Sequence, residues 1–75
     1  MNNGPTHLQW FELHMKNGEV ISYAEDYHLP AEKGLIGDFK RGQKKFLQYG
    51  CLFRDYYIPF DQISFIVLTE VQKIV

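Results

Sequence analysis

The stretch Phe11–Tyr23, FELHMKNGEVISY, decides the fold. Apolar and polar residues alternate up to Met15, which is the period of a half-buried β-strand. Asn17-Gly18 follows, and this dipeptide is the strongest short signal for a hairpin, because a type I′ turn needs positive φ at both central residues. The sequence therefore predicts a hairpin, with one strand beginning at Leu8 and a return strand over residues 19–27.

A two-residue turn also predicts the register of this hairpin, with Lys16 opposite Glu19. One face then carries large side chains on the first strand against small ones on the second, which is typical of a core. The residues of this predicted core face are Phe11, Leu13 and Met15 with Val20, Ser22 and Ala24.

The opposite face is rich in apolar and aromatic residues, whereas the solvated face of a sheet is mostly polar. Three interpretations stay open: the rest of the chain, a second subunit or a ligand covers this face. Aromatic side chains are enriched at interface cores, so the face is a candidate surface for self-association as a dimer. Its candidate interface residues are Trp10, Ile21, Tyr23 and Tyr27.

Residues 28–45 have little periodicity, and three glycines interrupt any long helix. Leu35, Ile36 and Phe39 still predict a short turn of helix against the sheet. The next stretch, residues 43–49, fits a strand or a helical turn, and Gly50 is expected to end it.

Strand character returns over residues 51–58, and Pro59 ends this strand because proline cannot donate to a ladder. Residues 60–62 form a short turn. Residues 63–71 are the most apolar part of the chain, which predicts a final strand buried on both faces.

The fold class predicted from these elements is mainly β: a strongly bent antiparallel sheet or a small barrel, with room for one short helix or helical turn in residues 31–49. With 75 residues the chain has the length of one small domain. We expect a disordered lead over residues 1–6 and one β domain over residues 7–75. The predicted core is Phe11, Leu13, Met15, Val20, Ala24, Leu52, Ile58, Ile63, Phe65 and Val67.

Two pieces of the chain resemble the small Sm-like and SH3-like barrels. Residues 16–19 sit between two early strands, and residues 57–66 read as a strand, a tight link and a final strand. In Sm-like proteins this resemblance implies an oligomeric ring that binds RNA. Pro59, Phe60 and Asp61 stand at the late turn, where bacterial Sm-like chains carry a lysine and a histidine, so the resemblance transfers no binding residue.

The net charge of −1 conceals a strong segregation along the chain. Residues 1–32 carry five acidic residues against Lys16, whereas residues 33–45 carry five basic residues against Asp38. A basic segment is a candidate footprint for an anion such as nucleic acid. The competing interpretation is a solvated surface that offsets the acidic first third.

Aromatic residues lie among these cations in residues 33–49, and aromatic rings stack on unpaired bases. The candidate nucleic-acid-binding residues are Lys40, Arg41, Lys44, Lys45, Phe46 and Tyr49. We therefore predict a non-enzymatic, regulatory binding module for RNA or single-stranded DNA. A homo-oligomerising protein-interaction module is the alternative.

Catalytic motifs with specific spacing are missing from the sequence. Gly34–Gly37 lacks the lysine of a phosphate-binding loop, and the three histidines with Cys51 match no metal-site spacing. We predict no metal site, no cofactor and a structural thiol. A small ribonuclease that uses Glu12, His14, Glu25 and Arg54 is a weaker alternative, since RNA cleavage needs a base, an acid and a cation.

The start of the chain is polar and uncharged, unlike a signal peptide. Apolar runs stay shorter than the ~18–20 residues of a membrane span. The single cysteine, Cys51, excludes an internal disulfide framework, so packing or association must hold the chain together. These features predict a cytoplasmic protein that does not enter a membrane.

Overall fold

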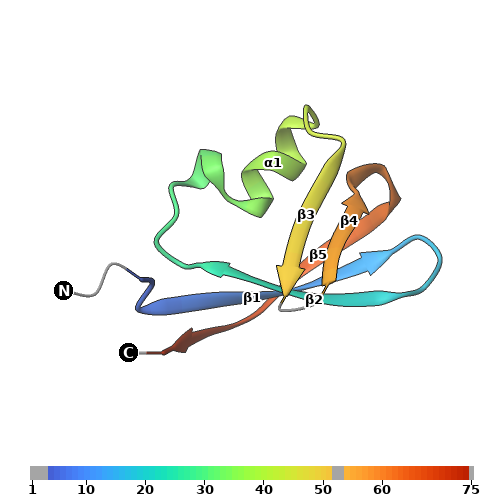
Figure 1. Cartoon of the computed structure of the whole chain (residues 1–75). Helices are drawn as coiled ribbons and strands as arrows, with labels where there is room; N and C mark the ends of the chain where they lie inside the picture. Colours follow the sequence, from blue (N-terminus) through green and yellow to red (C-terminus); the bar gives the residue numbers. More distant parts are fainter. Residues whose placement is uncertain (1–3, 52–53, 75) are drawn as a thin grey trace.

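The computed structural model describes residues 4–51 and 54–74. The elements are β1 (His7–Met15), β2 (Val20–Asp26), η1 (Ala31–Lys33), α1 (Leu35–Arg41), β3 (Phe46–Cys51), β4 (Arg54–Pro59), η2 (Phe60–Gln62) and β5 (Ile63–Lys73). The mainly-β prediction is confirmed, and α1 is the expected short helix (Figure 1). Residues 1–3 of the predicted lead lie outside the described residues.

Two antiparallel sheets make up the fold. One has three strands in the order β2-β1-β5, and the other is the two-stranded hairpin β3-β4. Figure 1 shows β3 and β4 crossing the larger sheet, with α1 standing beside them on the same side. The two sheets are separate ladders, so the strands form neither one strongly bent sheet nor a closed SH3-like or Sm-like barrel, and the mainly-β prediction alone holds.

The first hairpin turns through three residues rather than the predicted two. Gly18 donates its backbone N–H to the Met15 carbonyl at 3.0 Å, and Met15 donates its own N–H to the Glu19 carbonyl at 2.8 Å. Gly18 has a φ of 92°, as expected when a type I turn is followed by a left-handed glycine. The loop is therefore Lys16–Gly18, with Asn17 Oδ1 accepting the Glu19 N–H at 2.9 Å.

The extra loop residue shifts the register by one, and a shift by one exchanges the two faces of a strand. Phe11 pairs with Tyr23 and Leu13 with Ile21. The prediction that small residues of the second strand line the core is therefore wrong. Ala24 lies on the outer face beside Trp10.

The core lies between the sheets and beneath α1. Its buried members are Phe11, Leu13, Leu35, Leu47, Ile58, Phe60 and Ile63. Four of them were predicted, and Met15 packs against them. Val20, Phe65 and Val67 were predicted as core but are exposed, because they face away from β3, β4 and α1. Leu52 lies outside the described residues.

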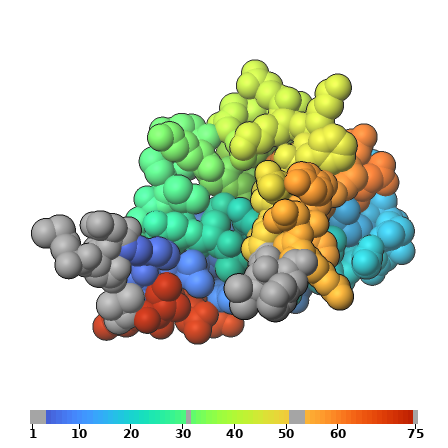
Figure 2. All heavy atoms as spheres, in the orientation of Figure 1, coloured from blue at the N-terminus to red at the C-terminus, as the bar shows by residue number. Residues whose placement is uncertain are grey.

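Strand β5 departs furthest from its prediction. It is an edge strand of the larger sheet. Only Ile63 is buried and Ile66 half-buried among its described residues. Figure 2 shows its C-terminal part, in red, at the lower surface of the molecule. The prediction that this apolar strand is buried on both faces is therefore wrong.

The second hairpin begins before Gly50 and continues past it. β3 pairs with β4 from Phe46 opposite Pro59 to Cys51 opposite Arg54. Gly50 therefore lies within the ladder, opposite Asp55, instead of ending the strand. This pairing brings the end of the basic segment next to the turn before β5.

Candidate nucleic-acid interface

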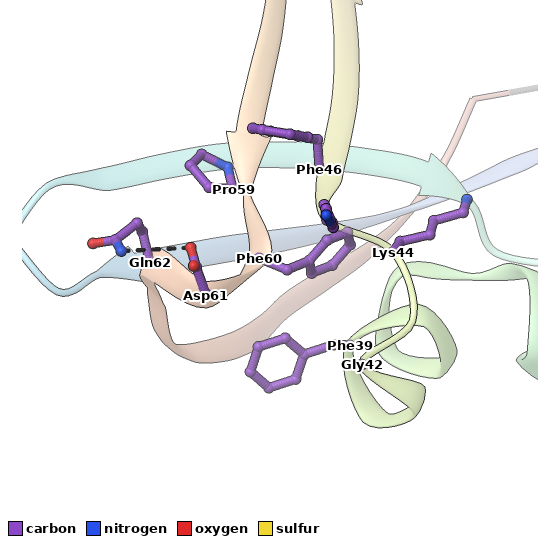
Figure 3. Close-up of a pocket in the computed structure, with 9 residues that line it drawn as sticks. Phe39, Gly42, Lys44, Phe46, Pro59, Phe60, Asp61 and Gln62 are labelled. Atoms are coloured by element: carbon purple, nitrogen blue, oxygen red, sulfur yellow. Dashed lines mark hydrogen bonds between the residues drawn. The ribbon is translucent and has the colours of Figure 1, made fainter.

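A pocket of about 660 Å³ opens where the end of α1, the start of β3 and η2 meet. Its lining residues are Phe39, Gly42, Lys44, Lys45, Phe46, Pro59, Phe60, Asp61 and Gln62. Figure 3 shows Phe60 between Phe46 above and Phe39 below. An apolar hollow with a few polar groups at its rim is the usual form of a ligand site.

Backbone pairing explains why these distant residues meet. Phe60 donates its N–H to the carbonyl of Lys45 at 3.0 Å, which fixes η2 against the start of β3. The ring of Phe60 is buried in the core, and its centroid lies 6.4 Å from that of Phe39. Phe60 therefore forms the floor of the pocket and joins it to the rigid interior.

Gly42 sets the path of the chain from α1 into the pocket. Its φ of 66° is left-handed, and its N–H donates to the carbonyl of Asp38, which closes the helix. Such a C-terminal glycine ends the helix sharply because it has no Cβ to clash. The chain then turns so that Lys44 and Lys45 line the pocket.

Asp38 organises two of the four predicted cations. Its side chain is buried and pairs with Arg41 Nη2, and its second oxygen lies 3.1 Å from Lys44 Nζ. In the described part of the chain, Lys40 and Lys45 form no ion pair with an acidic side chain. The positive charge available to a ligand is therefore greatest at Lys40 and Lys45.

The two predicted aromatic residues have different settings. Phe46 is 55% exposed at the pocket rim. Tyr49 points to the other face of β3, where its ring meets Tyr23 edge-on at 5.1 Å and stacks on Tyr56 at 6.2 Å. The structure therefore brings together Lys44, Lys45 and Phe46 and leaves Tyr49 out.

Pro59, Phe60 and Gln62 were missed as site residues. They lie more than ten positions beyond Phe46 in the sequence. Only the pairing of β3 with β4 brings them near the lysines. The available signal was the apolar Pro59-Phe60 pair in a turn, where exposed polar residues are usual.

A second polar cluster surrounds the buried carboxylate of Glu25. Its oxygens accept the backbone N–H of Leu35 at 3.1 Å each, the Gln9 amide at 3.1 Å and the Tyr23 hydroxyl at 3.4 Å. Burial raises the pKa of the Glu25 carboxyl, against the hydrogen bonds that lower it. Burial and the nearby Glu25 raise the pKa of Tyr23 to about 12. The cluster ties β2 to the start of α1.

The four predicted interface residues do not share a face. Trp10 is half-buried on the outer face and donates its indole N–H to Gln72 Oε1 at 2.9 Å. Ile21 and Tyr23 pack against the core on the inner face. Tyr27 lies beyond β2, exposed, with its ring 5.3 Å from that of His28. The predicted contact surface is divided because the hairpin register differs by one residue.

The residues of the ribonuclease alternative are also divided. His14 and Glu12 pair at 3.0 Å on the outer face, where His14 stacks on Phe65 at 4.2 Å. Glu25 lies on the inner face, and Arg54 begins a strand of the other sheet. The base, acid and cation of that proposal therefore do not meet.

Within residues 4–51 and 54–74, no group of three or more metal-ligating side chains is close enough to hold an ion. None of the helices described there has the length and apolar character needed to cross a membrane. No protein-family model, no curated protein and no solved structure matches the chain.

Proposed function

We propose that the protein is a non-enzymatic, regulatory binding module of the cytoplasm that holds single-stranded nucleic acid at the pocket between α1, β3 and η2. One observation carries the proposal: three phenylalanine rings and two lysines line the same pocket. Unpaired bases stack on aromatic rings while cations hold the phosphates. RNA and single-stranded DNA share this chemistry.

In this proposal the aromatic ring at the pocket rim stacks on a base, and the lysines contact the phosphates. The exposed ring of Phe46 offers a surface for one base, and base–aromatic stacking stabilises a complex by about 1–3 kcal/mol per base. Lys45 in the pocket lining and Lys40 in the last turn of α1, outside the lining, supply charge for the phosphates. Lys44 reaches them from its place beside Asp38, at the cost of part of that ion pair.

The charge available predicts weak, salt-dependent binding. About three phosphate contacts give a slope of roughly −2 in a plot of log affinity against log salt for a single strand. The pI of 6.2 agrees with a small local footprint rather than a broadly basic surface. The competing interpretation, a basic segment that is only solvated, predicts no specific binding site for nucleic acid.

The test is a titration of a labelled uridine decamer, followed by fluorescence anisotropy at low and moderate salt. Lys40→Ala/Lys45→Ala removes two cations without stripping the buried Asp38 of its partners, and we expect at least a tenfold loss of affinity. Arg54→Ala/Lys73→Ala makes the same change in charge at two exposed residues of β4 and β5 that do not line the pocket, and is the matched control. Equal binding by both double variants contradicts the proposal.

Phe46→Ala tests the stacking role. We expect about a tenfold weaker complex, as the loss of one stacked base implies. Tyr27→Ala removes another exposed aromatic ring, which contacts His7 and His28 instead of the pocket, and should leave the affinity unchanged. If Phe46→Ala binds the decamer with unchanged affinity, Phe46 does not stack on a base.

A further inference from the structure

Strand β5 is both the most apolar part of the chain and an open edge. Large apolar side chains are exposed on both of its faces: Phe65 is 51% exposed, Val67 38%, Leu68 53% and Val71 43%. Among the described residues it pairs with β1 alone, so alternate backbone N–H and C=O groups point away from the sheet. An unpaired edge of this kind is the surface to which another β-strand adds through backbone hydrogen bonds.

The devices that normally block an edge are scarce here. Charged residues and proline, which often block pairing at an exposed edge strand, do not occur in residues 63–69. Two irregularities interrupt the pairing of β1 with β5, between Trp10 and Phe11 and between His14 and Met15. They bracket a regular stretch, Phe65–Leu68, that consists only of apolar residues.

We propose that the occupant is β5 of a second copy, aligned antiparallel about a two-fold axis at Val67. The two three-stranded sheets then join into one sheet of six strands. The proposal does not rest on nucleic-acid binding, because β5 contributes no residue to the pocket.

The side chains agree with this register. Residues directly opposite each other in an antiparallel pair must lie on the same face. With the axis at Val67, Ile66 of one copy stands opposite Leu68 of the other, and both lie on the inner face. Val67 stands opposite Val67 on the outer face, so apolar side chains meet on both faces.

Charge favours the same alignment. Lys73 lies six positions after Val67, and Asp61 lies six positions before it. Antiparallel pairing therefore directs the Lys73 end of one copy to the Asp61 end of the other. Glu70 comes level with Ser64 of the second copy rather than with a carboxylate. A self-pair about Ile66 instead brings Lys73 level with Pro59, without this complementarity.

The first experiment measures the mass of the nucleic-acid-free protein by sedimentation equilibrium over a range of concentrations. We expect about twice the 8.9 kDa of one chain at high concentration. A protein that stays monomeric up to millimolar concentration overturns the proposal.

Val67→Lys places two like charges opposite each other at the axis and should weaken association at least tenfold. Val20→Lys is the matched control, because Val20 is an exposed valine in β2, at the opposite edge of the same sheet. Association lost equally in both variants, or retained in Val67→Lys, overturns the assignment to β5.

A mixing experiment with two charged variants distinguishes a loss of association from a loss of folding. Val67→Lys and Val67→Glu should each be monomeric alone and form a mixed dimer when combined, because residue 67 faces itself only in this register. Failure of two folded variants, with circular dichroism like that of the parent, to associate when mixed overturns the two-fold at Val67. Lys40→Ala/Lys45→Ala should dimerise normally, so each proposal can fail alone.

Discussion

The carboxylate of Glu25 accepts the backbone N–H of Leu35 at 3.1 Å to each of its two oxygens. One side chain of β2 thereby occupies the start of α1, ten positions further along the chain. The bond satisfies a backbone donor in the first turn of α1, whose N-cap residue, Gly34, makes no side-chain cap hydrogen bond. It also places an ionisable group inside the molecule, where protonation and folding are coupled.

The raised pKa of Glu25 makes folding stability depend on pH. The folded state holds the proton more tightly than the unfolded state, whose carboxyl has a pKa near 4.5. The resulting stabilisation is fully present below pH 4.5 and is lost as the pH rises through the higher folded pKa. Glu25→Gln should therefore flatten the dependence of the free energy of unfolding on pH.

Urea unfolding at a series of pH values from 4 to 8 measures this effect. Glu19→Gln removes an exposed carboxylate of the same hairpin and should keep the parent profile. Parallel profiles for the parent and Glu25→Gln rule out the coupling.

The hydroxyl of Tyr23 should ionise at a higher pH than that of an ordinary tyrosine. Its pKa of about 12 lies above the ordinary value of 10, because the hydroxyl is partly buried and faces Glu25. Absorbance at 295 nm should show one of the five tyrosines titrating near pH 12, and this phase should vanish in Tyr23→Phe. Since the folded state keeps the proton, stability should fall between pH 10 and pH 12. A single phase near pH 10 for all tyrosines contradicts the assignment.

Leu35 and Ile36 are adjacent in α1 but differ in burial. Leu35 is 1% exposed and Ile36 is 36% exposed. Leu35→Ala should cost about 2–5 kcal/mol of unfolding free energy, since it leaves a cavity in the core. Ile36→Ala should cost less than about 1 kcal/mol. Chemical denaturation of both variants tests the position of α1 on the sheet, and equal costs contradict it.

Gly42 occupies the left-handed region that ends α1. Gly42→Val should destabilise the fold by about 1–3 kcal/mol, because a β-branched residue is strained at this backbone conformation. Gly42→Asn should cost clearly less, since asparagine tolerates it best among the other residues. Thermal unfolding compares the pair, and the opposite order excludes the left-handed end of the helix.

Local signals in the sequence were sufficient for much of the secondary structure. Alternation before Asn17-Gly18 predicted the first hairpin, and the spacing of Leu35 and Phe39 predicted α1 despite three glycines nearby. These features depend on neighbours in the chain, so the sequence carries them directly.

The predictions fail where burial or pairing depends on residues that are distant in the sequence. Asn17-Gly18 allows a two-residue or a three-residue loop, and the burial of Tyr23 against Tyr49 comes from β3, which the loop residues do not encode. Likewise β5 is apolar, but in the part of the chain that the structure describes no layer covers most of its side chains. The pocket could not be predicted for the same reason: Phe60 meets Lys45 through a backbone bond between segments whose pairing was undecided.

The loop Lys16–Gly18 has one more consequence. It is exposed, and Lys16 donates its backbone N–H to the carbonyl of the pocket residue Gln62 at 2.8 Å. Its length also decides which face of the sheet each residue of β2 occupies. Losing one residue there would carry Ile21, Tyr23 and Glu25 to the solvent and bring Ser22 and Ala24 inward. Among related chains, insertions and deletions at this tip should therefore occur in twos, so that an exposed turn is as constrained in length as the interior is in volume.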